Sequence, residues 1–488
     1  MRKLLLATVA ALGASMAVAT VADAQTFPTP GTVTIRLNGR FRFYGGVVSD
    51  RNANNNVAGS PTGTVNALGQ GTLTGQNKQT SYGFINYGRL YPGFDGVSAN
   101  GLKYGASMEI RQDQYSGAGG GVFGGGSSQN RARSGLYFRR EWGYIGTDQL
   151  GTIRLGSTDQ PSSLYMTGNF ENFNDGGLDG DVGGLAAQAL ILPWPFADGQ
   201  GGYYTTTKAI YLSPQLYGFD FGVSYEPGTG NVSGVDACNG ASPIGNNFVN
   251  ANGAFTTATG GNGQAISGPG CDRLSSSPVN GESARRKNTV DALLRYRGTF
   301  GGFGIAATGG YIGGGHVLDN SGLAYNNNPL AAAGARPNYD GPSVGDFGIA
   351  LTYGGFSVGG KYMYGRFNGG VGTLVPKGLP DGEAILGGFS YTTGPIVVGA
   401  HYLNLKTAGD TNNAFFGRQR REQGLAAGGT YSLAPGISLF ASYLYSERKQ
   451  NGYNFITGQG VTTAAPGGNA FNNKVTAQVF AVGTGFSW

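Results

Sequence analysis

The stretch 32-TVTIRLNGRFRFY-44 alternates between two kinds of side chain almost without exception. One parity is apolar or small, from Val33 to Phe43, whereas the other is polar or basic and carries Arg36, Arg40 and Arg42. Successive side chains of a β-strand point to opposite faces. The stretch therefore predicts a strand with one apolar face and one polar face.

The same alternation recurs along the chain, for example over 102–111, 219–226, 290–297 and 347–353. Together with the turn residues between such segments, it predicts sixteen strands, an even number as in single-chain bacterial barrels. The predicted strands are 32–44, 80–91, 100–114, 133–147, 150–157, 203–213, 217–227, 286–298, 302–313, 345–354, 355–367, 383–393, 395–407, 421–433, 436–449 and 474–488.

The connectors between these strands alternate in length. Every second one is short and rich in turn residues, as at 147–151, 353–355, 392–395 and 433–436, and the connector at 92–101 is somewhat longer. The others are mostly long and polar: 45–79, 115–132, 158–202, 228–285, 314–344 and 450–473. Tight turns at one end and long loops at the other are expected of a membrane barrel, whereas a β-sandwich would not need this alternation.

Composition narrows the fold class further. Glycine supplies 92 of 488 residues, and charged residues are only 12%. No apolar run beyond the first 24 residues approaches the roughly 20 residues of a spanning helix, and lipid admits only helices and closed barrels. A secreted β-sandwich or β-helix is the alternative, but the periodicity favours an all-β, 16-stranded antiparallel transmembrane β-barrel.

The N-terminus predicts export. Arg2 and Lys3 precede a mostly apolar run, and Ala22-Asp23-Ala24 has the small-x-small pattern of a cleavage site. We expect residues 1–24 to be a signal peptide cut before Gln25, rather than an ordinary N-terminal helix. Its removal lowers the formal charge from +6 to +5, which is too mild to predict a nucleic-acid partner.

The C-terminus continues the pattern, with Phe480, Val482, Thr484, Phe486 and Trp488 on one face. An aromatic last residue on such a strand resembles the signal that the outer-membrane assembly machinery reads. We expect Phe480, Phe486 and Trp488 to form this assembly signal.

Two segments carry a resemblance to a known family. Residues 31-GTVTIRLNGR-40 are similar to the first strand, and 142-WGYIGTDQLGTIRLG-156 to the fourth and fifth strands, of Gram-negative general porins of the alphaproteobacterial type. The resemblance implies a usually trimeric barrel whose third extracellular loop folds inward and narrows a pore. It also implies outer-membrane lipid and lipopolysaccharide as surroundings and a homotrimer as the assembly.

The connector 158–202 occupies the place of that constriction loop. It contains no lysine or arginine, and aromatic residues such as Tyr165 and Phe173 could fix it to the wall; a solvated external loop is the alternative. The acidic residues that we expect at the constriction are Asp159, Glu171, Asp175, Asp179 and Asp181, and Asp198 lies further along the same connector.

Arginines of inward parity face this loop in the predicted barrel. Inward placement is favoured because arginine at the lipid midplane costs roughly 2–4 kcal/mol. The predicted basic wall consists of Arg36, Arg40, Arg42, Arg89, Arg111, Arg139 and Arg154. Alternatively, some of these arginines lie at the rim or pair with Glu109 and Glu141. A charge field across the lumen would set selectivity, but its sign stays open.

The remaining candidate residues predict no chemistry. Cys238 and Cys271 lie in the long extracellular loop 228–285 and could form a disulfide or remain free thiols. His316 and His401 are the only histidines, and the sequence predicts neither a metal site nor a cofactor, nor a catalytic constellation. The glycine-rich run 117–126 has no helix behind it for phosphate binding.

The sequence thus predicts a water-filled channel for passive diffusion of small hydrophilic solutes and ions, and not an enzyme. Residues of inward parity are polar or small, which leaves room for water. A substrate-selective channel, for example for sugars, and a non-conducting adhesin or structural barrel are the alternatives.

Overall fold

The structure is a computed structural model, and the part described here consists of residues 28–51, 61–65, 71–73, 81–113, 137–170, 172–173, 206–228, 285–317, 339–367, 375–376, 378–408, 420–451, 453–454, 459–460 and 474–488. Within these ranges no helix is long and apolar enough to cross a membrane. The predicted signal peptide lies outside them.

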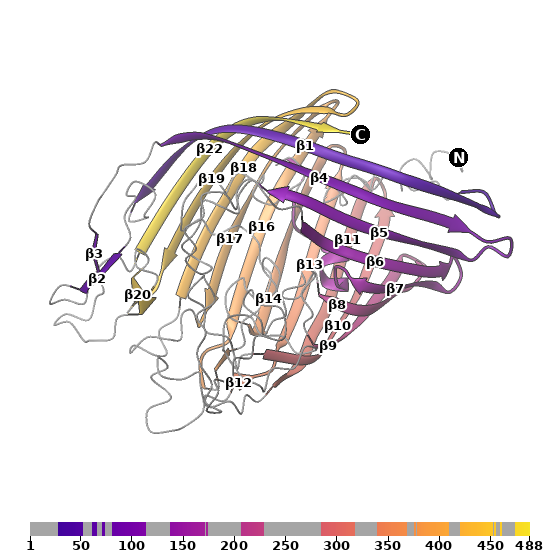
Figure 1. Cartoon of the computed structure of the whole chain (residues 1–488), viewed down its shortest axis with the longest axis horizontal. Helices are drawn as coiled ribbons and strands as arrows, with labels where there is room; N and C mark the ends of the chain where they lie inside the picture. Colours follow the sequence, from indigo (N-terminus) through magenta and orange to yellow (C-terminus); the bar gives the residue numbers. More distant parts are fainter. Residues whose placement is uncertain are drawn as a thin grey trace, which may run out of the picture.

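Sixteen of the described strands form one closed antiparallel barrel (Figure 1). They are β1 (Thr32–Arg51), β4 (Tyr82–Val97), β5 (Lys103–Asp113), β6 (Tyr137–Thr147), β7 (Gly151–Ser157), β8 (Thr207–Leu212), β9 (Phe219–Gly228), β10 (Arg285–Phe300), β11 (Phe303–Val317), β13 (Ser343–Tyr353), β14 (Phe356–Arg366), β16 (Gly382–Thr393), β17 (Ile396–Thr407), β18 (Arg420–Ala434), β19 (Ile437–Lys449) and β22 (Lys474–Ser487).

Short elements lie outside this sheet. Three two-stranded ladders pair β2 (Pro61–Val65) with β3 (Gly71–Leu73), β12 (Tyr339–Asp340) with β15 (Val375–Pro376), and β20 (Tyr453–Asn454) with β21 (Gln459–Gly460). The helix α2 (Pro161–Leu164) follows β7. In Figure 1 this helix lies within the ring of strands.

The sequence prediction of the fold class is confirmed, because each of the sixteen predicted segments overlaps one barrel strand. Two predicted strand ends were wrong by more than four residues. β1 continues to Arg51 and β4 to Val97, so the turn after β4 is tight, with Gly101 donating its N–H to the Ser98 carbonyl over 2.9 Å.

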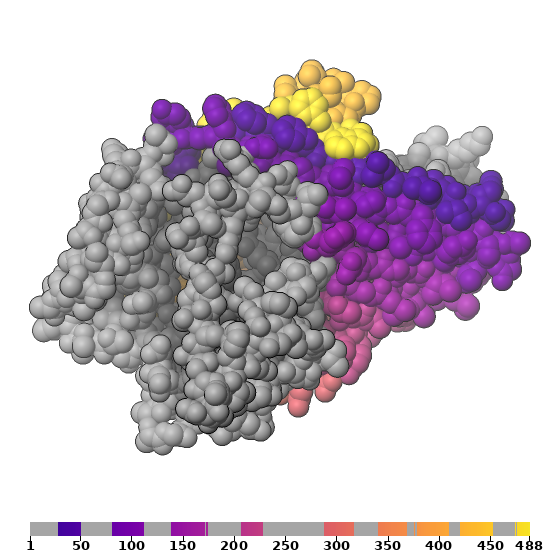
Figure 2. All heavy atoms as spheres, viewed as in Figure 1, coloured from indigo at the N-terminus to yellow at the C-terminus, as the bar shows by residue number. Residues whose placement is uncertain are grey.

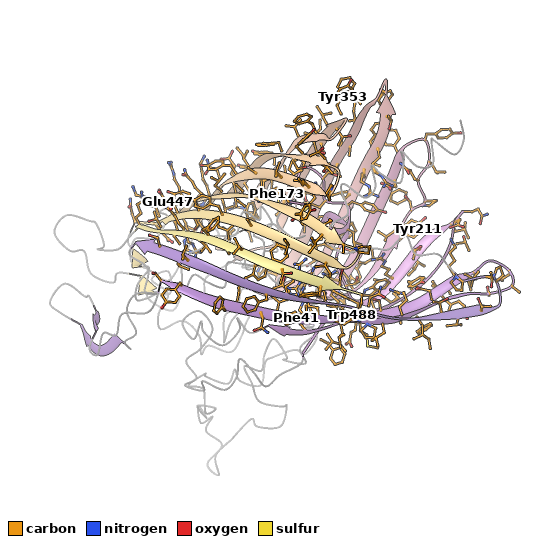
Figure 3. All side chains as sticks on the ribbon, turned by 90° about the horizontal axis from the view of Figure 1, so that it is seen from above. Phe41, Phe173, Tyr211, Tyr353, Glu447 and Trp488 are labelled. Atoms are coloured by element: carbon orange, nitrogen blue, oxygen red, sulfur yellow. The ribbon has the colours of Figure 1, made fainter. Side chains whose placement is uncertain are left out.

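The barrel closes between its first and last strands. Arg40 lies opposite Ser487, and the backbones of Gly39 and Trp488 exchange two N–H···O bonds of 3.2 Å. The Trp488 ring lies where a side chain on Gly39 would otherwise project. Phe41 and Trp488 mark this seam in Figure 3.

The predicted parity of the two faces is also confirmed. Apolar side chains on the outer face are half exposed, such as Ile349 at 50% and Phe480 at 50%, whereas Asp291 on the inner face is 1% exposed. An apolar outer surface around a charged interior is the arrangement of barrels that cross a lipid bilayer.

The expectation that inner residues are polar or small is wrong on part of the wall. Large apolar side chains on the inner faces of β11, β13, β14, β16 and β17 form one buried cluster that includes Met363, Leu386 and Leu403. A second cluster, around Tyr44 and Phe440, covers the inner side of the closing seam. Alternation alone cannot distinguish an inner face open to water from one that a loop covers.

Candidate pore constriction

The chain turns into the barrel directly after β7. Thr158 donates its N–H to the Thr206 carbonyl over 3.4 Å, and its own carbonyl accepts a bond of 2.9 Å from the buried Lys208 ammonium. Helix α2 then lies against β9 and β10, where the Ser162 N–H donates to the Asp291 carboxylate over 2.9 Å. The first turn of the loop is therefore held inside the barrel.

The next residues follow the inner wall over β13 and β14. Met166 packs against the apolar cluster of Met363 and Leu403. The Thr167 carbonyl lies against Gly348, which leaves no room there for a Cβ atom. Gly168 has a φ of +87°, a conformation that glycine adopts without strain.

The last described residues of the loop reach β16, β17 and β18. Asn172 donates to the Ser390 hydroxyl over 3.1 Å, and the Phe173 carbonyl accepts a bond of 3.2 Å from Thr430. The Phe173 ring is fully buried over Gly399 and meets the His401 ring edge-on at 5.4 Å (Figure 3). The inner loop segment, residues 158–173 without Glu171, thus runs along the inner wall from β7 to β18.

Arginines lie on the wall that this segment leaves uncovered. Arg40, Arg89 and Arg111 are directly opposite one another in the register of β1, β4 and β5. The guanidinium carbons of Arg40, Arg42 and Arg89 lie 5.8, 5.8 and 4.7 Å from the centre of the Tyr87 ring. Arg42 also donates to the Tyr87 hydroxyl over 2.7 Å. The aromatic ring allows like charges to gather, because its face attracts cations.

A β-bulge in β6 adds a further arginine. The register of β5 and β6 shifts between Glu109 and Ile110, so that Arg139 and Arg140 both reach the Glu109 carboxylate, at 3.0 and 2.8 Å. Arg111 pairs with the same carboxylate, and Arg140 also pairs with Asp159 at the start of the inner loop segment. Sequence parity missed Arg140, because a bulge places two consecutive residues on one side and cannot be seen in an alternating pattern.

Two of the predicted arginines lie nearer the tight turns. Arg36 pairs with Asp95 at 2.5 Å, and Asp95 also accepts a hydrogen bond from Tyr144. Arg154 lies over the Trp142 ring, with its guanidinium carbon 4.3 Å from the ring centre. The alternative partner Glu141 is on the exposed outer face, so Glu109, and not Glu141, holds the arginines.

The rest of the described inner wall also carries ion pairs. Asp346 and Lys361 form a fully buried pair at 2.5 Å, and Glu422 pairs with Arg448 at 2.5 Å. Asp220 holds both Arg295 and Arg297, at 2.7 and 2.8 Å. Arg295 lies 3.9 Å from the centre of the Tyr165 ring in the loop. Burial raises the pKa of the Tyr165 phenol above its ordinary value.

Several predicted site residues lie outside the described ranges. They are Glu171, Asp175, Asp179, Asp181, Asp198, Cys238 and Cys271. The predicted acidic side of the constriction therefore stays a prediction except for Asp159, which the structure places beside Arg140.

A closed barrel with an apolar outside, a charged inside and a loop segment against its inner wall defines a class of protein, the outer-membrane channels. The family model described as Gram-negative porin matches residues 7–268 and 239–451. The chain therefore belongs to the Gram-negative porin family, and forms a channel for passive diffusion in the bacterial outer membrane.

The chain is similar to several solved structures at low sequence identity. The anion-selective porin from Comamonas acidovorans is 14% identical, with 94% of this chain and 100% of that chain covered and a TM-score of 0.49. OmpT of Vibrio cholerae, in its trimer form, is 12% identical over 94% of this chain and 100% of its own, with a TM-score of 0.47. Salmonella typhi OmpF in complex with daunomycin is 13% identical over 93% and 97%, with a TM-score of 0.47. No curated protein matches the chain.

Proposed function

We propose that small hydrophilic solutes pass between the inner loop segment and an arginine wall, and that this passage favours small anions. The arginine wall consists of Arg40, Arg42, Arg89, Arg111, Arg139 and Arg140, with Arg36 and Arg154 below it towards the tight turns. Its carboxylates, on the same side of the lumen, are Asp95, Glu109 and Asp159.

The observation that carries the proposal is the row of Arg40, Arg89 and Arg111 across three neighbouring strands. Like charges directly opposite one another destabilise a sheet. The presence of three neighbouring arginines on the inner face therefore supports a function for positive potential in the lumen. The matched pairs elsewhere on the described wall, such as Asp346 with Lys361, add little net charge. Fixed charges along a pore wall set which ions enter.

Reversal potentials across a KCl gradient in planar bilayers test the sign of selectivity. We expect chloride preference in the wild-type channel and a shift of the permeability ratio towards potassium by roughly twofold in the Arg40→Gln/Arg89→Gln variant. Arg421→Gln, which removes the same kind of charge from the outer face, is a control that should leave the ratio unchanged. Potassium preference in the wild type would reject the proposed sign.

The same preparations separate the alternative functions. A diffusion pore admits neutral sugars into liposomes according to size alone, whereas a substrate-selective channel saturates with its sugar. A non-conducting structural barrel gives no current steps in the bilayer. We expect size-dependent, non-saturating uptake, because the arginine wall, and not a track of exposed aromatic rings, borders the proposed passage.

The assembly belongs to the proposal as well: we infer a homotrimer in which the outer face of β6 to β8 contacts a neighbouring copy. Strands β7 and β8 have 7 and 6 residues, fewer than the roughly 9–11 residues that cross a bilayer. Across this sector Glu141 lies in register with Ser157, and Ser157 with Thr207. Figure 2 shows this sector as part of the continuous outer surface from indigo to magenta. A short, partly polar outer wall is better covered by protein than by lipid.

A further inference from the structure

A group of aromatic and basic side chains lies on the inner face of the barrel near the tight turns. Trp142 and Tyr144 of β6 have ring centres 5.7 Å apart, and Arg154 of β7 lies opposite Tyr144 in the strand register. The guanidinium carbon of Arg154 lies 4.3 Å from the centre of the Trp142 ring. All three side chains are partly exposed. Together with Tyr165 of the loop, we call these residues the lower cluster.

Tyr165 connects the lower cluster with β10. Its phenol interacts electrostatically with both Arg154 and Arg295, and the Arg295 guanidinium carbon lies 3.9 Å from the centre of its ring. Arg295 and Arg297 are both held by the Asp220 carboxylate. The loop thus adds a third ring to the cluster, on the side where the arginines already have an acidic partner.

The guanidinium of Arg154 has open donors, unlike that of Arg140. Arg140 pairs with Glu109 and with Asp159. Arg154 forms no hydrogen bond or ion pair with any residue in the described ranges, and its Nε is buried without a partner. Asp159 acts on Arg154 electrostatically, but its carboxylate is bound by Arg140. Because a buried donor without an acceptor costs free energy, Arg154 is suited to an acceptor that arrives through the lumen.

The lower cluster lies where solutes would leave the proposed passage. Tyr144 is close to the end of β6 at Thr147, and Arg154 is close to the start of β7 at Gly151. Tyr211 of the neighbouring strand β8 marks this end of the barrel in Figure 3. In a porin the short turns face the periplasm. A solute that has passed the arginine wall therefore meets the lower cluster next.

We propose, on the basis of the passage proposed above, that the lower cluster is a binding site for aromatic carboxylates. The carboxylate of such a solute accepts hydrogen bonds from the forked donors of Arg154, which an ammonium group cannot offer in the same geometry. Its ring lies among Trp142, Tyr144 and Tyr165, because aromatic rings attract one another beyond the effect of the area that they bury. Neutral sugars lack the carboxylate and chloride lacks the ring, so neither is retained.

Block of the channel current by matched anions tests this site in the full-length protein. Benzoate and cyclohexanecarboxylate have the same carbon skeleton and the same charge, but only benzoate has a flat aromatic ring. We expect half-maximal block of the KCl current in planar bilayers at a roughly fivefold lower concentration of benzoate than of cyclohexanecarboxylate. Benzyl alcohol, which has the ring without the charge, should leave the current unchanged at the same concentrations.

Two variants separate the forked donor and the ring from the charge. Arg154→Lys keeps the positive charge, so the reversal potential in a KCl gradient should stay unchanged while benzoate block weakens roughly fivefold or more. Trp142→Leu should bring the half-blocking concentrations of the two anions to within roughly twofold of each other. Arg421→Gln, on the outer face, is the control and should be blocked like the wild type. Folding of each variant is checked by the change in gel mobility on heating.

Equal block of the wild type by benzoate and cyclohexanecarboxylate overturns the proposal. Unchanged benzoate block in Arg154→Lys, or an unchanged ratio between the two anions in a folded Trp142→Leu barrel, overturns it as well. The failure of this site is distinguishable from the failure of the proposed passage. Chloride preference without selective block by benzoate rejects the site alone, whereas a wild-type barrel that carries no current rejects both.

Discussion

Glycines on the inner wall determine how closely the inner loop segment can approach. The Phe173 ring occupies the place of a side chain at Gly399, and the Thr167 carbonyl does the same at Gly348. At Gly222 an added Cβ would lie 2.9 Å from Pro161. From the sequence these glycines are predicted only as small residues on the inner face. The structure shows that the loop segment packs against them.

Replacing Gly399 should therefore detach the end of the loop. In Gly399→Val the new side chain displaces Phe173, and overpacking of this kind costs about 1–3 kcal/mol. We expect single-channel conductance to change by roughly 1.5-fold or more, because the proposed passage runs between this loop segment and the arginine wall. Gly387→Val, on the open outer face of β16, is the matched control and should conduct like the wild type. Unchanged conductance in a folded Gly399→Val barrel would mean that the segment does not narrow the pore.

Arg140 should matter more than its neighbour Arg139. Arg140 contacts both Glu109 and Asp159, whereas Arg139 contacts Glu109, which Arg111 also reaches. We expect Arg140→Gln to lower chloride preference and to increase current noise, because Asp159 at the loop start loses its described cation. Arg139→Gln should lower chloride preference alone. Equal noise in the two variants would argue against a role of the Arg140–Asp159 pair in holding the loop.

At the scale of the element, the sequence predicts every barrel strand but not every strand end. Alternation fails after Tyr44, where Gly45 and Gly46 carry no side-chain signal, so the extension of β1 to Arg51 could not be seen. Pro92 suggested an end of β4 because it lacks an N–H, yet β4 continues opposite β1, with Leu37 facing Pro92. The bulge at Arg139 and the covered apolar inner wall were missed because both depend on contacts between distant segments.

The last strand should be the most sensitive element for assembly. Deleting Trp488 removes two backbone hydrogen bonds to Gly39 and an exposed ring at the closing seam. We expect the fraction of barrel in the outer membrane, measured by heat-dependent gel mobility, to fall several-fold in cells. Phe347→Ala, which removes an outer aromatic from β13, should change it little. If purified chains lacking Trp488 also refold poorly in detergent, seam stability rather than recognition by the assembly machinery explains the loss.

The whole molecule presents two unlike outer surfaces. On β17 to β22 the outer face is apolar from below the charged residues Arg421 and Lys449 down to Tyr431. On β6 to β8 the apolar part of the outer face is shorter, because it ends below Glu141 and Thr207. In the sequence both groups of strands show the same alternation of apolar and polar residues. The strand register shows that the outer face of β6 to β8 has fewer apolar positions along each strand. This asymmetry indicates which side faces lipid and which faces protein.

Arginine substitutions on the two faces test this assignment directly. An arginine on a lipid-facing position costs roughly 2–4 kcal/mol at the midplane but does not separate neighbouring copies, whereas an arginine in a subunit contact does. We expect Ala209→Arg on β8 to convert the SDS-resistant oligomer of unheated samples to a folded monomer, because the side chain would separate neighbouring copies. Gly387→Arg on β16 should leave the oligomer intact. Loss of the oligomer in Gly387→Arg but not in Ala209→Arg would place the contact on the opposite side of the barrel, and an unheated wild-type monomer would reject the trimer itself.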